Sequence, residues 1–540
     1  MRFRLPVLVS LLALAAPAFA QEPTFSPDAI RADVTFLADD LLEGRDAGTR
    51  GYDIAVRFVA ARFAALGLTQ AVKDSWYQPV TLALADLDKT APAALTIGGQ
   101  RFANGTDVAI GGFGREAKQS IAAGAVFVGY GLQSDREKID DYAGLDLKGK
   151  FAVALSGSPV GMPSEVGAHL AAEKALAAQK AGAIGLITLP SPSLLARMPW
   201  DKLRERSNDP VVSWIDGQGQ PYVRTPAIRA TATVHGPAAE ALFAGSRGNL
   251  AAILEQAGKK GGRPKGFALQ PLVTLERASS VSTAPSANVL AMLPGSDPTL
   301  AHEYVLLMAH LDHNGVKQSA KGDDKIYNGA MDNASGTATM LAVAKAFTEG
   351  GARPKRSILF AAVTAEEDGL LGSQYLAKHP VLPAGGKLVG VVNLDMPILT
   401  YDFQDVVAFG AEHSTLGPIV DRAAQSVGVA LSPDPLPAEG LFTRSDHYRF
   451  VQEGVPAVFL MTGFAGAGKA AFEHFLKTQY HQPSDQIDLP FNWNAAAKFA
   501  RVNYAIARQI ADAPEAPRWY AQDFFGDAFA ADQPKAPSPK

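Results

Sequence analysis

The sequence predicts an α/β fold: a three-layer sandwich with a mostly parallel central sheet, into which a second, β-rich domain is inserted. The first observation is a set of near-continuous apolar runs in the second half of the chain, typical of strands that helices bury on both faces. The second is that helical stretches alternate with these runs. The runs lie at 287–293, 303–310, 357–364, 388–395 and 456–462, and the helical stretches at 336–350 and 369–379.

The first twenty residues predict a secretory signal peptide. Arg2 and Arg4 precede a sixteen-residue apolar run, Leu5 to Ala20, which closes with Ala-Phe-Ala before Gln21. A basic start, an apolar core and a small-residue cleavage site define such leaders, whereas a membrane-spanning helix needs about 20 apolar residues. No later segment is apolar for long enough to span a membrane, so we expect no stable membrane anchor once the leader is removed.

Composition narrows the partners and the compartment. The chain contains no cysteine, which excludes disulfides, thiolate metal ligands and cysteine nucleophiles. An exported chain without disulfides indicates a bacterial periplasm or the surrounding medium. Without the leader, 48 basic side chains face 54 acidic ones, and this mild acidity argues against nucleic acid as a partner, because phosphate binding depends on clustered Lys and Arg. The remaining 520 residues are too many for one core and predict two or three domains.

Residues 21–109 are interpreted as the first part of the main domain. Apolar side chains recur every three or four residues over 52–65, which indicates a helix that ends at Gly67. A Gly-rich, charged loop, LLEGRDAGTRG at 41–51, joins this helix to an earlier helical segment that begins at Asp28.

Residues 110–265 differ in texture and are interpreted as the inserted domain. Strand-like runs surround an Ala-rich helix at 169–182, and a Gly- and Lys-rich stretch at 258–266 is typical of an exposed connector. The strand-like runs lie at 123–131, 149–157 and 183–189, and a charged, Pro-bearing stretch at 196–224 leads to residues 224–234. The main domain resumes over 266–519, and residues 520–540 form a C-terminal tail that we expect to be partly disordered.

Five short motifs place metal-binding side chains along the second half of the chain, several of them at the ends of predicted strands. Sites in open α/β sheets form at the carboxyl ends of strands, so these side chains can converge. Two divalent ions about 3.5–4 Å apart can hold a substrate carbonyl and the attacking water together. The motifs AHLDH (309–313), MDN (331–333), TAEEDGLLGS (364–373), NLDM (393–396) and QYHQPSD (479–485) supply His310, Asp332, Glu367, Asp395 and His481.

The residue types suit zinc, which favours imidazole and carboxylate ligands; cobalt or manganese would fit the same set. Three carboxylates supply three negative charges against the four positive charges of two zinc ions. Glu366, adjacent to Glu367, is the candidate general base. Asp312 lies two residues after His310 at a strand end, so both side chains face one side, and its carboxylate is expected to hold that imidazole without binding metal itself.

Each motif alone has a simpler structural interpretation. Asp332 and Asn333 could form a turn and a helix N-cap, and adjacent glutamates often form a solvated acidic turn. A single histidine is more often structural than a ligand, and His447 is an alternative to His481. The occurrence of all five motifs, in order and at strand ends, favours the metal centre.

Two other site types are disfavoured. Residues 463–470 follow a predicted strand and match a phosphate-binding loop except at the last position, where the pattern needs Ser or Thr to hold magnesium and Ala470 cannot. A serine hydrolase is unsupported, because the chain has no Gly-x-Ser-x-Gly motif.

The motifs resemble those of the co-catalytic zinc peptidases, which include bacterial leucyl aminopeptidase, aminopeptidase S, glutamate carboxypeptidase II and the catalytically inactive transferrin receptor ectodomain. The His-x-Asp, Asp-Asn, Glu-Glu-x-Gly-Leu-x-Gly-Ser, Asn-Leu-Asp-Met and Tyr-His elements match over about 290–510. The loop at 41–51 is similar to the N-terminal segment of that family, and the inserted domain resembles the protease-associated domain of many members. The resemblance implies a phosphorylase/hydrolase-like sandwich.

Carried over to this sequence, the resemblance implies that Asp332 bridges two zinc ions. His310 and Asp395 would complete one ion, and Glu367 and His481 the other. A cis peptide bond would follow the bridging aspartate.

The resemblance also implies a mechanism and a function. A water held between the metals would lose its proton to Glu366 and attack a peptide carbonyl, and Tyr480 would donate a hydrogen bond to the developing oxyanion. The expected function is an exported metallo-exopeptidase that acts on peptides as an aminopeptidase. A carboxypeptidase or dipeptidase of the same family, or a non-catalytic receptor-like binding protein, are the alternatives, and the motifs imply no particular oligomeric state.

Overall fold

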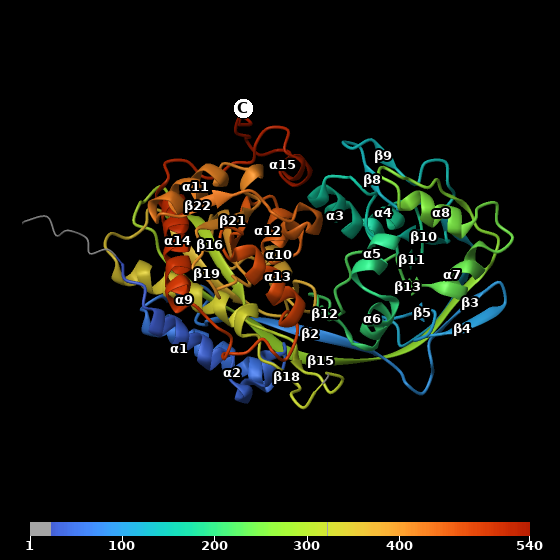
Figure 1. Ribbon diagram of the computed structural model, residues 1–540, viewed down its shortest axis with the longest axis horizontal. Helices are drawn as coiled ribbons and strands as arrows, with labels where there is room; N and C mark the ends of the chain where they lie inside the picture. The colour runs from blue at the N-terminus through green and yellow to red at the C-terminus, as the bar shows by residue number, and fades with distance from the viewer. Residues whose placement is uncertain (1–22, 321, 540) are drawn as a thin grey trace, which may run out of the picture.

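The computed structural model describes residues 23–320 and 322–539. The predicted signal peptide, 1–20, lies outside the described residues. Figure 1 shows a larger and a smaller lobe; a 13-stranded sheet forms the centre of the larger lobe and extends into the smaller one through its strands at 94–97 and 100–103, and a six-stranded sheet lies in the smaller lobe. Within the described ranges, no helix is both long and apolar enough to cross a membrane.

The large sheet contains the five strands that the apolar runs predict, together with shorter ones. Its strands are β1 (Thr69–Gln70), β2 (Tyr77–Leu87), β3 (Ala94–Ile97), β4 (Gln100–Ala103), β6 (Lys118–Ala123), β12 (Val211–Trp214), β15 (Val273–Leu293), β16 (Glu303–His310), β19 (Ser357–Val363), β20 (Lys387–Leu394), β21 (Asp405–Phe409), β22 (Ala430–Ser432) and β23 (Ala457–Thr462).

The centre of this sheet is parallel. Its main order is β12-β2-β15-β19-β16-β20-β23-β21-β22, with the remaining strands attached to β15 and β3. β16 pairs in parallel with β19 and β20, and β20 pairs in parallel with β23. Every residue of β16 and β19 is buried, as continuous apolar runs between two helical layers require. The strands next to this centre, β15 and β21, run antiparallel to β19 and β23.

Helices pack on the sheet of the larger lobe. α9 and α14 contact each other and β16, while α10 and α12 contact each other and pack against β15, β20 and β23. The predicted helices at 52–65, 336–350 and 369–379 correspond to α2, α9 and α10. The bounds are α1 (Pro27–Leu37), α2 (Arg50–Ala65), α9 (Ser335–Glu349), α10 (Leu371–Lys378), α11 (Leu416–Ser426), α12 (His447–Val451), α13 (Gly468–Thr478) and α14 (Trp493–Asp512).

The smaller lobe has its own sheet, ordered β14-β7-β10-β11-β13-β5, and its own hydrophobic core. Its strands are β5 (Val108–Ala109), β7 (Ala125–Phe127), β8 (Gln133–Ser134), β9 (Ile139–Asp140), β10 (Phe151–Leu155), β11 (Gly185–Leu189), β13 (Ala230–Val234) and β14 (Phe267–Ala268), of which β8 and β9 pair separately. Its helices are α3 (Ser164–Ala172), α4 (Lys174–Lys180), α5 (Pro192–Arg197), α6 (Trp200–Glu205), α7 (Gly236–Phe243) and α8 (Leu250–Ala257).

The predicted inserted domain, 110–265, does not coincide with the smaller lobe, and the two lobes share strands. The core of the smaller lobe draws residues from Ala93 to Leu275, and β12, inside that range, pairs with β2 of the large sheet. The 21-residue strand β15 runs from one lobe into the other, pairing first with β3 and β6 and then with β2 and β19. The predicted helix at 169–182 is divided at Glu173, where ψ is 0°.

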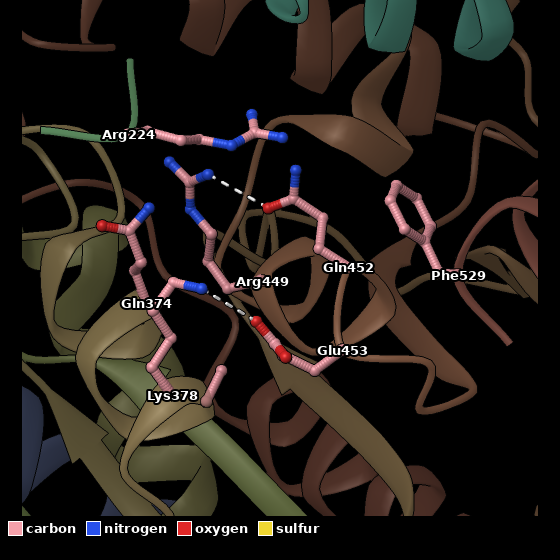
Figure 2. Close-up of a pocket in the computed structure, with 8 residues that line it drawn as sticks. Arg224, Gln374, Lys378, Arg449, Gln452, Glu453 and Phe529 are labelled. Atoms are coloured by element: carbon pink, nitrogen blue, oxygen red, sulfur yellow. Dashed lines mark hydrogen bonds and ion pairs between the residues drawn. The ribbon is translucent and has the colours of Figure 1, made fainter. Parts of the chain in front are cut away.

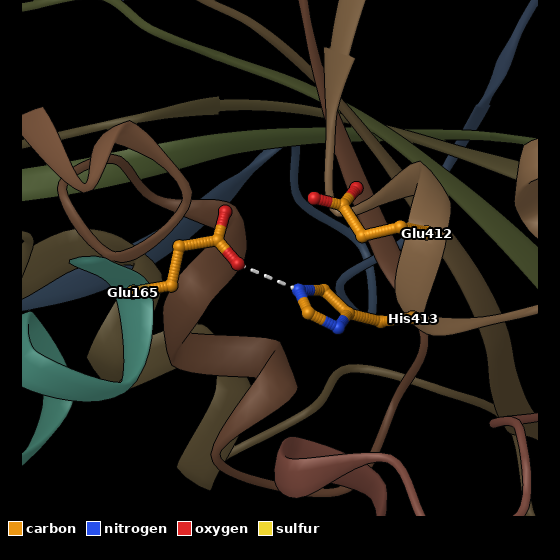
Figure 3. A group of neighbouring side chains, drawn as sticks. All are labelled: Glu165, Glu412 and His413. Carbon is orange, nitrogen blue, oxygen red and sulfur yellow. Dashed lines mark hydrogen bonds and ion pairs between the residues drawn. The ribbon is translucent and has the colours of Figure 1, made fainter. Parts of the chain in front are cut away.

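The C-terminal tail packs against both lobes, which differs from the expected partial disorder. α15 (Phe524–Phe529) follows Trp519, and both Trp519 and Phe525 are almost fully buried. Next to it, His413 lies beside Glu165 of α3, and its chain neighbour Glu412 is close to both (Figure 3). The His413 Nε2 atom is 2.8 Å from Glu165, and its Nδ1 atom is 2.6 Å from Asp523 at the start of α15. Aromatic burial and these contacts give the tail the order that its composition did not predict.

Candidate metal centre

Three neighbouring strands end at the candidate metal centre. His310 is the last residue of β16, Asp395 follows β20 directly, and Glu366 and Glu367 lie in the loop after β19. Because β16 pairs in parallel with both β19 and β20, these side chains emerge at the same edge of the sheet.

The first group of possible ligands contains His310, Asp332 and Asp395. The Nε2 atom of His310 is 3.2 Å from Oδ1 of Asp395 and 3.3 Å from Oδ1 of Asp332. The second carboxylate oxygen of Asp395 accepts a 2.6 Å hydrogen bond from Ser445, which itself accepts one from Asn393. Hydrogen bonds from Ser445 and Asn393 therefore orient the carboxylate of Asp395, and the ligand atoms of the group lie close together.

A second group shares Asp332 with the first. The Nε2 atom of His481 is 3.3 Å from Oδ2 of Asp332 and 3.0 Å from Oε2 of Glu367. The two oxygens of Asp332 thus face different histidines, Oδ1 toward His310 and Oδ2 toward His481. A carboxylate in this position can bridge two ions.

Three hydrogen bonds hold the backbone around Asp332. The carboxylate of Asp485 accepts hydrogen bonds from the backbone N–H groups of Met331 (2.8 Å) and Asp332 (3.0 Å). The amide of Asn333 donates to the carbonyl of Leu394, the last residue of β20, at 2.9 Å. The peptide bond between Asp332 and Asn333 is cis, as the resemblance implied.

Arg45, from the Gly-rich loop at 41–51, supports the same region, a role that sequence reasoning did not assign to it. Its guanidinium is almost fully buried and donates to the carbonyls of Leu311 (2.9 Å), Asn328 (2.5 Å) and Gly329 (3.1 Å). The N-terminal helix pair is in this way tied to the loops that carry the ligands on both sides of the centre.

Asp312 holds a different part of the centre from the one we predicted. The His310 Nδ1 atom lies 3.1 Å from the backbone carbonyl of Asp312, whereas the carboxylate is 4.0 Å away. That carboxylate instead accepts hydrogen bonds from the backbone N–H groups of Glu366 (3.1 Å) and Glu367 (3.2 Å). The loop after β19 offers unpaired N–H groups, and these compete successfully for the carboxylate.

Glu366 and Tyr480 lie at the edge of the two groups. Burial, with the nearby carboxylates of Asp395 and Glu367, raises the pKa of Glu366 well above its ordinary value. The ring of Tyr480 stacks on His481 with centroids 3.9 Å apart. Burial raises the pKa of Tyr480 above that of free tyrosine, so its hydroxyl keeps its proton and is a hydrogen-bond donor.

One histidine near the candidate ligands, His313, was not predicted as part of the metal centre. The Nδ1 atom of His313 is 2.7 Å from Oε1 of Glu367 and 4.0 Å from Oδ2 of Asp332, and its ring packs edge-on against His481. The contact between Nδ1 and Oε1 lacks hydrogen-bond geometry, so among the described residues neither ring nitrogen of His313 forms a hydrogen bond. Gly329 allows this position: φ is +58° there, and a Cβ atom would lie 2.6 Å from the imidazole. The signal was present in the sequence as the last residue of AHLDH.

His447, the alternative to His481, lies elsewhere. Its ring is fully buried beside Phe442 and Phe459, and burial lowers its pKa to about 3. The loop at 463–470 also has an internal role. Asp405 accepts hydrogen bonds from the N–H groups of Gly463 and Ala465, through its carbonyl and its carboxylate respectively, so these two donors are not free for a phosphate.

The electrostatics of the centre favour cations. Burial opposes the charged form of His481, but Glu367 and Asp332 outweigh it and raise its pKa to about 10. The buried Oε1 atom of Glu367 and the ring nitrogens of His313 lack hydrogen bonds within the described part of the chain. Unpaired buried donors and acceptors are rare unless a ligand satisfies them. With imidazole and carboxylate as the only ligand types, the residues fit zinc.

Comparisons with known proteins agree with this geometry. The family model described as "Peptidase family M28" matches residues 288–507. A probable leucine aminopeptidase 2 of Aspergillus fumigatus is 30% identical over 191 residues, which is 34% of this chain and 35% of that protein. A probable zinc metalloprotease of Pyrenophora teres is 40% identical over 110 residues, covering 20% of this chain and 22% of that protein. The chain thus aligns with about a third or less of these relatives.

The fold has a counterpart that extends over both lobes. The aminopeptidase from Aneurinibacillus sp. strain AM-1 superposes with a TM-score of 0.50, covers 91% of this chain and 95% of its own, and is 21% identical. This likeness concerns the fold alone. Residues 288–507 of this chain match the model of peptidase family M28, and the two groups of possible metal ligands lie within that matched segment.

Proposed function

We propose that this protein is a zinc-dependent aminopeptidase that removes residues from the N-terminus of peptides. One observation carries the proposal: the two oxygens of Asp332 face two separate groups of ligands. A shared carboxylate between two such groups suits a pair of metal ions better than a single one. The name of the Aspergillus fumigatus relative supports the choice of an aminopeptidase.

The ligands divide into two sets around Asp332. His310 and Asp395 would complete one zinc site, and Glu367 and His481 the other, with His313 beside Glu367. The name of the Pyrenophora teres relative supports zinc. When bound, the metal pair would lower the pKa of water and polarise the substrate carbonyl.

Glu366 would act as the general base and then as the general acid. Its raised pKa suits a group that must accept a proton and later return it. The carboxylate would take a proton from the attacking water and deliver it to the amine of the departing residue. The contacts from Asp312 to the N–H groups of Glu366 and Glu367 fix the loop on which both glutamates lie.

Tyr480 would stabilise the charge that develops on the carbonyl oxygen. Its hydroxyl is protonated at neutral pH, because burial raises its pKa. A donor held rigidly by stacking on His481 needs no reorganisation when the oxyanion forms.

The proposal also includes export of the protein and a role for the smaller lobe. The predicted leader at 1–20 supports export to the periplasm or the medium. The smaller lobe, with its separate sheet, would be a protease-associated-like domain that limits access to the centre. From the peptidase side, His413 contacts Glu165 of this lobe, and Asp527 of the tail contacts its Arg136.

The first experiment is mass spectrometry of a free-ended decapeptide incubated with the purified mature protein, with and without a chelator. A ladder that shortens from the N-terminus and disappears on chelation would support the aminopeptidase. Loss of residues from the C-terminus would replace it with a carboxypeptidase of the same family. No cleavage after zinc or cobalt is added would support the non-catalytic binding protein.

A further inference from the structure

A cavity of about 130 Å³ lies between the two lobes. Arg224 reaches it from the smaller lobe, and Gln374 and Lys378 of α10 with Arg449 of α12 reach it from the larger one, beside Gln452 (Figure 2). Its volume is close to that of a cavity of roughly 150 Å³ known to hold a benzene molecule. A small ion or an organic acid would fit.

The cavity contains more positive charge than its carboxylates neutralise. Arg224 forms a two-pronged pair with Glu173, both contacts at 2.6 Å. Lys378 lies 3.1 Å from Glu453. Arg449, by contrast, forms no ion pair with any residue that the structure describes.

The partners of Arg449 are neutral. It donates to the amide oxygen of Gln452 at 3.2 Å and to the carbonyl of Gly369 at 2.9 Å. Its Nε atom is buried and has no hydrogen-bond partner in the described chain. A buried charged donor without a partner is costly, so it indicates a missing acceptor.

Arg449 also lies close to a second cation, and the carboxylates of Asp446 and Glu173, although near enough to favour its charge, form no ion pair with it among the described residues. Figure 2 shows its guanidinium beneath that of Arg224. Burial and the proximity of Arg224 both lower the pKa of Arg449. An anion placed between the two groups would remove this repulsion and accept from both.

We propose that this cavity is a binding site for a small oxyanion, either phosphate or the carboxylate of an organic acid, held between Arg224 and Arg449. Planar guanidinium groups match both kinds of anion through paired hydrogen bonds. The amides of Gln374 and Gln452 add neutral donors at the wall. None of the residues that line the cavity is a proposed ligand of the metal centre.

The site is connected to the catalytic loop through one hydrogen bond. Arg449 holds the carbonyl of Gly369, and the N–H of Gly369 donates to the carbonyl of Glu366 at 2.9 Å. An anion that draws Arg449 toward Arg224 would therefore change the loop that carries Glu366 and Glu367. This coupling, unlike the binding itself, rests on the proposed role of Glu366.

The test measures the melting temperature of the zinc-loaded protein at constant ionic strength, in chloride and after about 10 mM phosphate or acetate replaces part of it. We expect a rise on the order of 2 °C with at least one anion. The rise should vanish in Arg449→Gln and in Gln452→Glu, which supplies an internal carboxylate. It should persist in Arg422→Gln, a matched control at an exposed position of α11.

The outcomes distinguish phosphate from a carboxylate as the bound anion, and the cavity from the metal centre as its binding site. A response to phosphate alone identifies a phosphate site, and a response to acetate identifies a carboxylate site. A rise that survives Arg449→Gln would place the anion at the metal centre and overturn the proposal, as would the absence of any rise. Anion binding without a change in kcat for peptide cleavage would overturn only the coupling to the loop that carries Glu366. If the protein binds the anion but cleaves no peptide, the proposed function fails and the anion site stands.

Discussion

Replacing His313 tests whether this histidine is part of the metal centre. The change His313→Gln keeps a polar side chain of similar length but removes the ring nitrogen that lies 2.7 Å from Oε1 of Glu367. His313 is almost fully buried and the Oε1 atom of Glu367 is buried as well, so water cannot replace this contact easily. We expect the zinc ion on the side of Glu367 and His481 to bind more weakly.

The size of the effect follows from the position of His313. Loss of a residue that orients or supplements a metal ligand lowers metal affinity by about 10- to 100-fold, which is about 1.4–2.8 kcal/mol. The other site should change little, because His313 does not approach His310 or Asp395 in either of the two groups of possible ligands. The variant should therefore keep one tight zinc ion and lose the second at low free zinc.

The assay is zinc content by mass spectrometry after equilibration in chelator-buffered zinc over a range of free concentrations. His447→Gln is the matched control, since His447 is also fully buried in the same lobe but packs against phenylalanine rings. Thermal unfolding of the metal-free proteins checks that both variants fold. Two zinc ions of wild-type affinity in His313→Gln would refute the assignment.

Four further predictions follow from the geometry. Glu366→Gln should keep both zinc ions and lower kcat by about 100-fold or more, measured as turnover and metal content together. Tyr480→Phe should lower kcat by about 10- to 100-fold with little change in KM, since a single oxyanion donor is lost. Arg45→Met should destabilise the fold by about 3–5 kcal/mol, as urea unfolding will show, because four carbonyls, including that of Leu37, lose a buried charged donor. Burial opposes the charge of His413, but Asp523 and Glu165 raise its pKa to about 10. The charged histidine therefore adds several kcal/mol to the free energy of unfolding; this stabilisation is fully present below about pH 6.5 and is lost as the pH rises through 10. His413→Gln should flatten the stability–pH curve between pH 7 and 10.

The parallel centre of the sheet was predictable because its strands are buried on both faces. Burial of every position in β16 and β19 leaves a continuous apolar run, which is a strong local signal. The same runs ended at His310 and Asp395, so their proximity followed from the parallel topology. For these residues, local pattern and tertiary arrangement agree.

The link between the lobes was not predictable in the same way. The sequence indicated only 287–293 as a strand, whereas β15 begins at Val273. Its middle, from Ser280 to Pro285, is largely exposed and rich in Ser and Ala, so it has no apolar alternation. β12 lies in a charged stretch for a similar reason and is ordered by its pairing with β2.

The supporting residues of the centre depend on contacts across the chain. Asp485 binds backbone groups 153 and 154 residues away, and Arg45 binds carbonyls more than 260 residues away. No periodicity marks such partners. The carboxylate of Asp312 illustrates the same limit, because its competing donors are N–H groups whose position depends on the fold.

The two halves of the metal centre are built differently, and this has a consequence for how they bind metal. His310 and Asp395 are anchored at the ends of adjacent parallel strands, which hold ligands more precisely than loops do. On the other side, His481 lies in a loop with φ of +52° and is about a third exposed. The side with Glu367 and His481 has an additional imidazole, that of His313, whereas on the other side the ends of two strands hold the ligands in place. A third histidine would compensate for a ligand on a less rigid segment, so the ion beside Glu367 should depend on His313 more than the ion beside Asp395 depends on any single ligand of its loops.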